Sequence, residues 1–497
     1  MKTTPDRRTF IRNVILGGFS LYLPACKNSP KEIKQEPTSA IDTIENIEKT
    51  VETIDEYFKS EQVVLLRKAD EQYTNLNIGF NKRVPKNPKI IALCKNVKGI
   101  SEAIKYAKFF KLQVCIKSGG HSFEGFSSND GGMCINLSLL KDIEWINEET
   151  VKLGSGVILK EVYNALLPKG KIIPSGSCAG VGVAGLTLGG GYGLFSRAYG
   201  LTCDSLKELT MVDGEGNILS VKSDDELMWA CRGGGNGNFG VISDMTFRVH
   251  QAPKIFTRHL FKAKNITQEK AISLLKDWFN ITAQLPNSCF GAYVLNHNDL
   301  TVLVTDIDDK TEEIRTVLEG FGEKMDSANI GRKETDIPRA LRRYYGIQTP
   351  LFFKNACAGL YNGFGDIENC IESVVKQVFN NRGLIYQVNT LGGNIQNPEF
   401  EKASAYPHRA YPYLSELQAY YDKPERKASL LAAFQEIQET FTNNGLSAHY
   451  RNYPDINFEN WQSAYYGKNY ARLQKIKGKY DPDNVIWHPQ SIRLVSK

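Results

Sequence analysis

Short apolar runs alternate with amphipathic stretches in the first half of the chain, and this pattern predicts strands that alternate with helices. The runs of strand length are 90–94, 114–116, 151–153, 172–173 and 241–249. The stretches with helical spacing are 101–110, with Ser101 as its candidate N-cap, 159–167, and a short segment that starts at Asp224 or Asp225. A hairpin is predicted where 209–212 and 218–221 flank the turn Asp-Gly-Glu-Gly. These elements form a first predicted domain over 61–253.

Residues 254–445 have fewer glycine clusters and a stricter alternation of apolar and polar positions. Strands 290–295 and 300–305 are predicted to form a hairpin across the turn Asn-His-Asn-Asp. Helical spacing over 269–279 and 312–321 adds two helices. We therefore predict a second, α+β domain built on an antiparallel sheet.

Two glycine-rich loops each carry a nucleophilic side chain. His121 lies in Lys-Ser-Gly-Gly-His-Ser (117–122), and Cys178 lies in Ser-Gly-Ser-Cys-Ala-Gly (175–180). Each loop follows a predicted αβ unit, so the two side chains occupy the same kind of position. Glycine lets backbone N–H groups approach a phosphate or a flat ring closely. Two ordinary turns, one with a buried histidine and one with a buried cysteine, are the alternative interpretation.

The segment after Cys178 matches the dinucleotide fingerprint G-x-G-x-x-G at Gly180, Gly182 and Gly185, and Asp204 lies about where a ribose-binding acid belongs. That fingerprint has to open a helix whose N-terminus faces the pyrophosphate. Because a glycine cluster follows at 189–193, we expect no helix here. We predict instead an extended glycine ribbon that packs against a flat ligand, and no Rossmann site.

The N-terminus is predicted to be an export signal. Residues 6–12 resemble a twin-arginine signal, and an apolar stretch over 14–25 is too short to span a bilayer. It ends at Cys26 in a lipobox-like sequence, in which Pro24 is unusual. Over 1–26 we therefore predict a twin-arginine-like signal of a periplasmic or cell-envelope lipoprotein, tethered to the membrane through a lipidated Cys26. A plain secretory signal or a short membrane anchor is the alternative.

Residues 27–60 are rich in Lys, Glu, Pro, Ser and Thr and are predicted to form a tether, to which 41–58 adds a helix. At 497 residues the chain is too long for one hydrophobic core. The net charge of +6 is spread along the chain without a basic stripe, which argues against a nucleic-acid partner. The 10 cysteines show no metal-site spacing, so no metal is predicted. The spacing assigns no disulfides, and the oligomeric state stays open.

Several further motifs occur in a fixed order. They are Ser-Gly-Gly-His-Ser at 118–122, Cys178 followed by the glycine segment 182–193, Gly-Val-Ile-Ser-Asp at 240–244, Tyr-Pro-His-Arg at 406–409, Asn-Tyr-Pro-Asp at 452–455, Tyr-Gly-Lys-Asn-Tyr at 466–470, Lys-Tyr-Asp-Pro-Asp-Asn-Val at 479–485 and Gln-Ser-Ile at 490–492. With these motifs, residues 85–497 resemble the berberine bridge enzyme-like branch of the vanillyl-alcohol oxidase/p-cresol methylhydroxylase flavoproteins. The resemblance implies an α+β fold with a two-part FAD-binding domain, in which 446–497 completes 61–253, and an α+β substrate domain over 254–445.

The resemblance also implies that FAD is attached twice, through His121 to the flavin 8α-methyl group and through Cys178 to ring carbon 6. The expected cofactor-binding residues are Ser118, Gly119, Gly120, His121, Ser122, Cys178, Val181, Gly182, Val183, Gly185, Gly190, Gly240, Val241 and Asn452. Val181 matches a position thought to gate oxygen access, and a valine there favours an oxidase. Phe123 replaces an aromatic hydroxyl of many plant relatives, which argues against a plant-like lignol site.

The resemblance makes Tyr453 the candidate general base, with a packed aromatic as the alternative. A phenol with an ordinary pKa of about 10 acts near neutrality only with a lowered pKa or by concerted transfer. Tyr192 matches an active-site tyrosine. Strand 411–421 places Glu416 and Gln418 on one face, and either matches a polar position that orients or deprotonates the substrate. His408 and Arg409 are expected to be structural.

The leading functional hypothesis is a bicovalent FAD oxidase that acts on a small molecule and O₂. It oxidises an alcohol, first a carbohydrate hemiacetal and second a phenolic or natural-product substrate, by hydride transfer to flavin N5, and O₂ is reduced to H₂O₂. One alternative is an FAD-dependent dehydrogenase with a quinone or cytochrome acceptor. The other is an exported flavin-containing binding protein without turnover.

Overall fold

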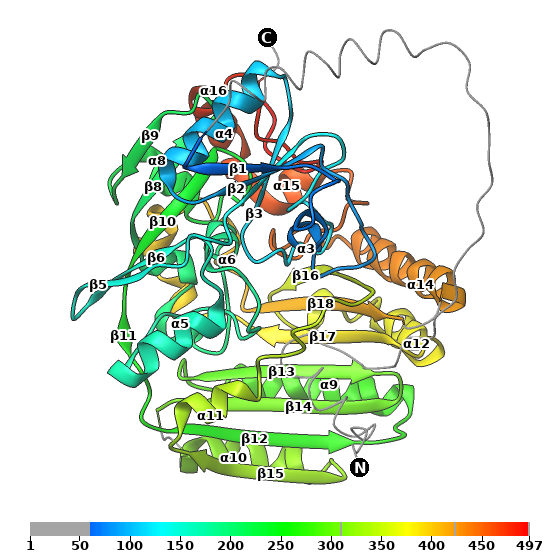
Figure 1. Ribbon diagram of the computed structural model, residues 1–497. Helices are drawn as coiled ribbons and strands as arrows, with labels where there is room; N and C mark the ends of the chain where they lie inside the picture. The colour runs from blue at the N-terminus through cyan, green and yellow to red at the C-terminus, as the bar shows by residue number, and fades with distance from the viewer. Residues whose placement is uncertain (1–59, 309–310, 422–423, 496–497) are drawn as a thin grey trace, which may run out of the picture.

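The computed structural model describes residues 60–308, 311–421 and 424–495 (Figure 1). The predicted export signal, Cys26, the helix over 41–58 and nearly all of the tether lie outside these residues. The described chain forms three main sheets, and two of them contain only antiparallel neighbours. Within the described ranges, no helix has the length and apolarity needed to cross a membrane. The mixture of helices and largely antiparallel sheets confirms the predicted α+β class.

The first sheet places the His121 loop. Its strands in spatial order are β1 (Val63–Leu66), β2 (Ile90–Cys94), β4 (Met133–Asn136) and β3 (Val114–Lys117). Both predicted strands, 90–94 and 114–116, are confirmed, and β3 is one residue longer. Helix α4 (Val97–Phe109) starts earlier than predicted, because Asn96 Oδ1 caps it by accepting from Gly99 N (3.1 Å). Ser101 is instead buried inside the helix and donates to Gly216 O.

The second sheet supports the Cys178 loop and contains the predicted hairpin. Its strands in order are β5 (Ile143–Asn147), β6 (Thr150–Gly154), β10 (Gly240–Arg248), β8 (Leu206–Asp213) and β9 (Ile218–Val221). Helix α5 (Leu159–Leu166) follows β6 as predicted. The next strand, β7 (Lys171–Ile172), leaves this sheet and pairs with β11 (His250–Gln251). The two αβ units therefore have different topologies, although each ends in a glycine loop.

The glycine segment after Cys178 contains a helix, so the prediction of a purely extended ribbon was wrong. Helix α6 (Val183–Leu188) begins directly after Gly182 and includes one glycine, Gly185. Its apolar side chains Val183 and Leu188 are buried, and this burial outweighs the helix cost of a single glycine. The glycine cluster begins only at Gly189, where the helix ends, and a second short helix, α7 (Ser196–Tyr199), follows.

The third sheet has seven antiparallel strands and confirms the predicted second sheet. Its strands in order are β15 (Ser327–Glu334), β12 (Phe256–Ala263), β14 (Asp299–Asp306), β13 (Cys289–Asn296), β17 (Leu384–Thr390), β18 (Tyr413–Tyr420) and β16 (Phe353–Tyr361). The predicted hairpin is β13–β14. One face packs on the helices α9 (Gln268–Thr282), α10 (Thr311–Gly322), α12 (Ile371–Asn380) and α14 (Pro424–Asn443) (Figure 1). The other face turns toward the glycine loops and α11 (Ile337–Arg342).

The C-terminal segment returns to the first two sheets. Helix α15 (Trp461–Tyr466) precedes α16 (Tyr470–Tyr480), which packs on α8 (Glu226–Cys231) (Figure 1). Beyond α16, the chain pairs with β3: Val114 N donates to Val485 O (2.8 Å) and Trp487 N donates to Val114 O (3.0 Å). Residues 446–456 meanwhile lie along β16, so the segment contacts both halves of the molecule.

Candidate active site

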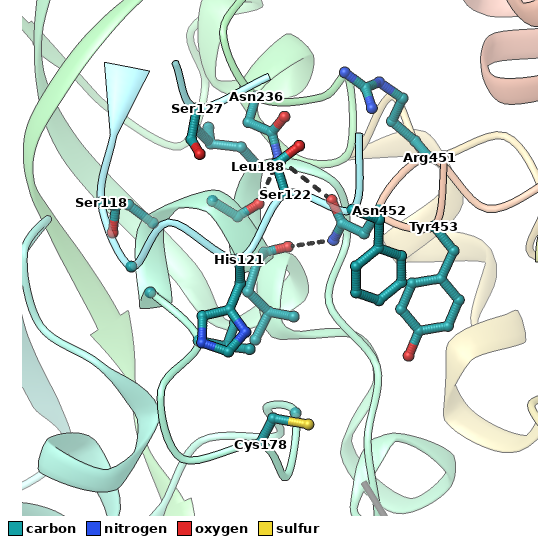
Figure 2. A pocket seen from close by; sticks show the side chains of 18 of the residues that line it. Ser118, His121, Ser122, Ser127, Cys178, Leu188, Asn236, Arg451, Asn452 and Tyr453 are labelled. Carbon is teal, nitrogen blue, oxygen red and sulfur yellow. Dashed lines mark hydrogen bonds between the residues drawn. The ribbon is translucent and has the colours of Figure 1, made fainter. Parts of the chain in front are cut away.

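One continuous cavity lies where the two glycine loops, α6, the C-terminal segment and the seven-stranded sheet meet (Figure 2). The predicted site residues that line it are Ser118, Gly119, Gly120, His121, Ser122, Cys178, Val181, Gly182, Gly185, Tyr192, Gly240, Glu416, Asn452 and Tyr453. These residues come from segments more than 330 positions apart in the chain. The fold therefore brings both nucleophiles and three of the four candidate catalytic residues to a single space.

His121 is held as a neutral imidazole on the cavity wall. Its ring stacks on Phe80 with centroids 4.1 Å apart and an interplanar angle of 13°. Burial lowers the pKa of His121 to about 3, so a ring nitrogen keeps its lone pair at neutral pH. A Cβ on Gly180 would lie 2.7 Å from His121 Nε2, so a glycine is required where the second loop passes the ring. A neutral, close-packed imidazole is suited to act as a nucleophile.

Cys178 lies on the same wall, and Figure 2 shows its side chain below His121. Burial raises the pKa of the Cys178 thiol well above its ordinary value, and the negative charge of Glu416 raises it further. The thiol is therefore protonated at neutral pH. Any covalent chemistry at its sulfur requires that a bound group or a base removes this proton.

The cavity floor is built by glycines that touch backbone to backbone. A Cβ on Gly119 would overlap Gly182 N, and a Cβ on Gly182 would overlap Ser118 Oγ. At Gly189, a Cβ would collide with the side-chain amide of Asn452. The two loops and α6 thus present their main chain directly to the cavity, as a flat ring and a pyrophosphate require.

Asn452 connects the C-terminal segment to this floor. Its Nδ2 donates to Leu186 O and to Tyr450 Oη, both at 2.9 Å, and its Oδ1 accepts from Asn236 Nδ2 at 3.4 Å (Figure 2). Tyr450 Oη in turn accepts from Gly191 N (3.0 Å). Asn452 therefore holds α6 and the following glycines in place.

Tyr453 and Tyr192 form a hydrogen-bonded pair at the edge of the seven-stranded sheet. Tyr453 Oη donates to Tyr192 Oη (3.1 Å), and Asn389 Nδ2 also donates to Tyr192 Oη (3.1 Å). The ring of Tyr453 stacks on Phe123, with centroids 5.2 Å apart. Burial raises the pKa of both phenols well above 10, and the charge of Glu416 acts in the same direction. Both phenols are therefore neutral, and Tyr453 can accept a proton only while passing on its own.

A wall of carboxamide side chains from β16 and β17 faces the tyrosine pair. It consists of Asn355, Gln387 and Asn389, which all line the cavity. Gln387 Nε2 donates to Asn389 Oδ1 (2.8 Å). None of these three residues was predicted from the sequence. Gln387 and Asn389 do share one face of β17, where polar and apolar residues alternate, and this alternation is a signal that could have found them.

Glu416 joins this wall as a buried carboxyl group. Asn355 Nδ2 donates to Glu416 Oε1 (3.0 Å). Burial raises the pKa of Glu416 to about 8, which the hydrogen bonds from Gln418 and Asn355 partly oppose. At pH 7 the group is therefore largely protonated, and it gains its charge above about pH 8. Glu416 can act as a proton donor near neutrality and as a base only at higher pH.

Four predicted site residues do not reach the cavity. Val183 and Val241 are fully buried in the core, and Gly190 adopts φ of 110° and packs against Tyr406. Gln418 is buried behind the wall, where its Nε2 donates to Gln387 Oε1 (3.1 Å). The side chains of Val183 and Val241 point into the core, whereas their neighbours Ala184 and Gly240 line the cavity.

Arg409 forms a buried ion pair, consistent with a structural role. Its guanidinium donates to both carboxylate oxygens of Asp204, at 3.0 and 2.5 Å. Asp204, which lies about where a ribose-binding acid belongs in the sequence motif, therefore binds Arg409. His408 Nε2 lies 2.8 Å from Ala464 O, and burial lowers the pKa of His408 to about 4.

The end of the cavity near β3 contains polar residues that sequence reasoning missed. Arg451 donates to Tyr466 Oη (2.9 Å) and to His488 Nε2 (3.1 Å), and the ring of His488 stacks on Phe126. Together with Asn236, these side chains offer cationic and amide donors beside the glycine floor. A glycine floor, two nucleophiles and a donor-rich end together fit a flavin dinucleotide.

Comparisons with known proteins agree with this geometry. Residues 88–222 match the family model of the FAD binding domain, and residues 449–493 match the model "Berberine and berberine like". The chain is 28% identical over 439 residues to an uncharacterized FAD-linked oxidoreductase of Bacillus subtilis, with 86% of this chain and 96% of the relative covered. It is 26% identical over 442 residues to a chitooligosaccharide oxidase of Gibberella zeae, with coverages of 83% and 89%.

Among solved structures, the glucooligosaccharide oxidase of Acremonium strictum, described as having a novel flavinylation, superimposes with a TM-score of 0.79. The identity is 23%, and the match covers 91% of this chain and 99% of that one. The fold and the site define an FAD-dependent oxidoreductase. The two matched segments are those of berberine and berberine-like FAD-binding proteins, and the chain is similar to such FAD-linked oxidoreductases over most of its length.

Proposed function

We propose that the protein is an oxidase with doubly attached FAD that oxidises an alcohol, first a carbohydrate hemiacetal, which becomes a lactone. The observation that carries the proposal is that His121, Cys178 and the Tyr453–Tyr192 pair line one cavity. The wall of Asn355, Gln387 and Asn389 supports a polyhydroxylated substrate, because a carboxamide both donates and accepts hydrogen bonds. Relatives named for chitooligosaccharide and carbohydrate oxidation support the same class. Phenolic or natural-product substrates come second.

In this proposal the protein orients the substrate and moves one proton. The carboxamide wall binds the sugar hydroxyls, and Tyr453 Oη accepts the proton of the reacting hydroxyl group. The existing hydrogen bond lets Tyr453 pass its own proton to Tyr192 Oη while Tyr192 releases its hydroxyl proton to water, so no tyrosinate is needed beforehand. FAD, once bound, supplies the hydride acceptor and then the electrons that reduce O₂ to H₂O₂.

Peptide mapping tests the double attachment through His121 and Cys178. We expect proteolytic peptides with each residue to carry the mass of FAD and the yellow colour to survive acid precipitation. The variants His121→Ala and Cys178→Ser should each keep one attachment and turn over more slowly. Release of all the flavin from the wild-type protein by acid would rule out the proposed attachments.

Two alternative functions are compatible with the same cavity. A dehydrogenase would pass its electrons to a quinone or a cytochrome, and it would show slow reoxidation by O₂ after substrate has reduced the flavin. An exported flavin-containing binding protein would bind small molecules without turnover. The presence of both nucleophiles and Tyr453 in one cavity argues against such a binding protein. Anaerobic bleaching of the flavin by a sugar, a phenol or an amine would exclude it, because bleaching shows that the substrate reduces the flavin.

Val181 offers a direct test of oxidase against dehydrogenase, because its side chain lines the cavity beside Gly182. We expect Val181→Leu to slow reoxidation of the reduced enzyme by O₂ more than it slows reduction by substrate. The added methylene fills space in a packed site and leaves the residues of the tyrosine pair unchanged. Stopped-flow mixing of reduced enzyme with O₂ measures both half-reactions. Unchanged reoxidation in the variant, or sluggish reoxidation in the wild type, would favour the dehydrogenase.

The proposed setting of this reaction is the periplasm or the cell envelope. It rests on the twin-arginine-like residues 6–12 and on Cys26, which follows the apolar stretch. The twin-arginine route carries folded proteins, and this suits a cofactor that is inserted before export. Fractionation of producing cells distinguishes a membrane-tethered lipoprotein from a released or cytoplasmic protein.

A further inference from the structure

We propose that Lys354, on the neighbouring strand β16, is a positioning residue that holds the rings of Tyr453 and Phe123 in place relative to each other. The inference rests on the proposed function, in which Tyr453 accepts the substrate proton. Lys354 itself does not line the cavity, whereas the next residue, Asn355, does. Its role would therefore be exerted through the residues that it binds.

The ammonium group of Lys354 is buried between two carboxylates. Its Nζ lies 2.7 Å from Glu124 Oε1 and 2.5 Å from Asp455 Oδ1, and the lysine is 3% exposed. A second cation, Arg83, binds the other oxygen of Glu124 at 2.6 Å. Two positive and two negative side chains thus form a neutral cluster away from bulk solvent.

The two carboxylates sit beside the two rings that face each other across the cavity edge. Glu124 directly follows Phe123, and Asp455 lies two residues after Tyr453. The two rings stack with centroids 5.2 Å apart and an interplanar angle of 23°. One lysine therefore links the loop that carries His121 to the segment that carries the candidate base.

Strand β16 also holds the main chain of this segment. Cys357 N donates to Tyr453 O (2.9 Å), so the carbonyl group of Tyr453 and the carboxylate of Asp455 are both fixed to the same strand. Asp455 also accepts from Asn457 N (3.0 Å) and Gln438 Nε2 (3.2 Å). Because three donors from three segments bind its two oxygens, the carboxylate of Asp455 is held in one orientation, and Lys354 links it to Glu124.

The energetics favour a positioning role over a stabilising one. A buried ion pair is often no more stabilising than apolar side chains of the same volume, while loss of one partner leaves an uncompensated charge. The Lys354 cluster brings together four chain segments that an apolar contact would join with less directional precision. A shift of about 1 Å at a reacting group can cost about 10²-fold in rate.

The central experiment compares Lys354→Met with the wild-type holoenzyme. In anaerobic stopped-flow mixing with a sugar that bleaches the wild-type flavin, we expect flavin reduction at saturating sugar to fall by about 10–10²-fold. The apparent Kd of the sugar should stay within about threefold, because the carboxamide wall is unchanged. Lys354→Arg keeps the charge and the donors and should recover most of the rate.

Two further variants separate positioning from loss of stability. Lys477→Met breaks another fully buried lysine–carboxylate pair, with Asp481 at 2.5 Å, and neither member of this pair lines the cavity. It should lower the unfolding temperature and leave the rate of flavin reduction within about twofold. The double variant Lys354→Met/Asp455→Asn keeps the Arg83–Glu124 pair and leaves no unpaired charge, so we expect it to fold while flavin reduction stays slow.

Hydrogen exchange gives a readout that does not depend on turnover. We expect Lys354→Met to speed amide exchange in peptides over 121–126 and 450–457 together, and Lys477→Met to leave both unchanged. If no substrate bleaches the wild-type flavin, the proposed function fails, and exchange still tests the linkage. Wild-type flavin reduction in Lys354→Met or in the double variant, an equal slowing in Lys477→Met, or unaltered exchange in both peptides would overturn the proposal.

Discussion

Replacement of Tyr453 by phenylalanine is expected to slow reduction of the flavin by substrate by about 10²–10⁴-fold, the usual contribution of a general base. Folding and flavin incorporation should persist, because Tyr453 Oη contacts only Tyr192 Oη among the described hydrogen-bonding groups and the ring contact with Phe123 is retained. Anaerobic stopped-flow measurement of flavin bleaching at saturating substrate gives the rate directly. A near-normal rate would transfer the role to Glu416 or Tyr192.

Tyr192→Phe tests the proton relay in this prediction. It removes the hydroxyl group that accepts the proton of Tyr453 and keeps Tyr453 itself, so flavin reduction should slow by about the same factor as in Tyr453→Phe. The pH dependence separates Glu416 from the tyrosines. A carboxyl group with a pKa of about 8 is neutral below that pH and anionic above it, so a Glu416 base would make the rate rise through about pH 8. That rise would disappear in Glu416→Gln.

The elements that sequence periodicity predicted well are those whose burial pattern is regular. The hairpin β13–β14 and helix α5 occur where the alternation and the helical spacing placed them. Helix α4 was misplaced at its start, because Asn96 caps it from outside the periodic stretch. Helix α6 was not predicted, because the segment as a whole is rich in glycine. The helix itself contains only Gly185 and ends before the glycine cluster that begins at Gly189.

The site was predictable where chemistry depends on a short motif and not where it depends on strand pairing. His121, Cys178 and Tyr453 stand in local motifs, and the structure brings them to one cavity. Asn355, Gln387 and Asn389 meet only because β16, β18 and β17 are neighbours, with Gln387 paired to Glu416 in the register. A single sequence does not contain that order of strands. The same pairing places Gln418 behind Gln387 and out of the cavity.

The glycine floor leads to the second large expected effect. Gly119→Ala should reduce FAD incorporation by roughly tenfold or more, because overpacking of a tight contact costs about 1–3 kcal/mol and 1.4 kcal/mol is a factor of ten. The added Cβ would overlap Gly182 N and lie 2.8 Å from Gly180 O and 2.9 Å from Gly182 Cα. All three are main-chain atoms, so no side chain can rotate away, and the two loops that carry His121 and Cys178 would have to separate.

The ratio of flavin absorbance to protein absorbance in the purified variant, together with its unfolding temperature, measures this effect. Gly478→Ala is the matched control, because a Cβ there meets no atom within 4 Å and the residue lies within helix α16. Alanine has the higher helix propensity, so this control should keep its flavin and unfold at the same or a higher temperature. A Gly119→Ala protein with full flavin content would show that the two loops can separate and still bind the cofactor. In that case the backbone contact between Gly119 and Gly182 would not determine the shape of the cavity floor.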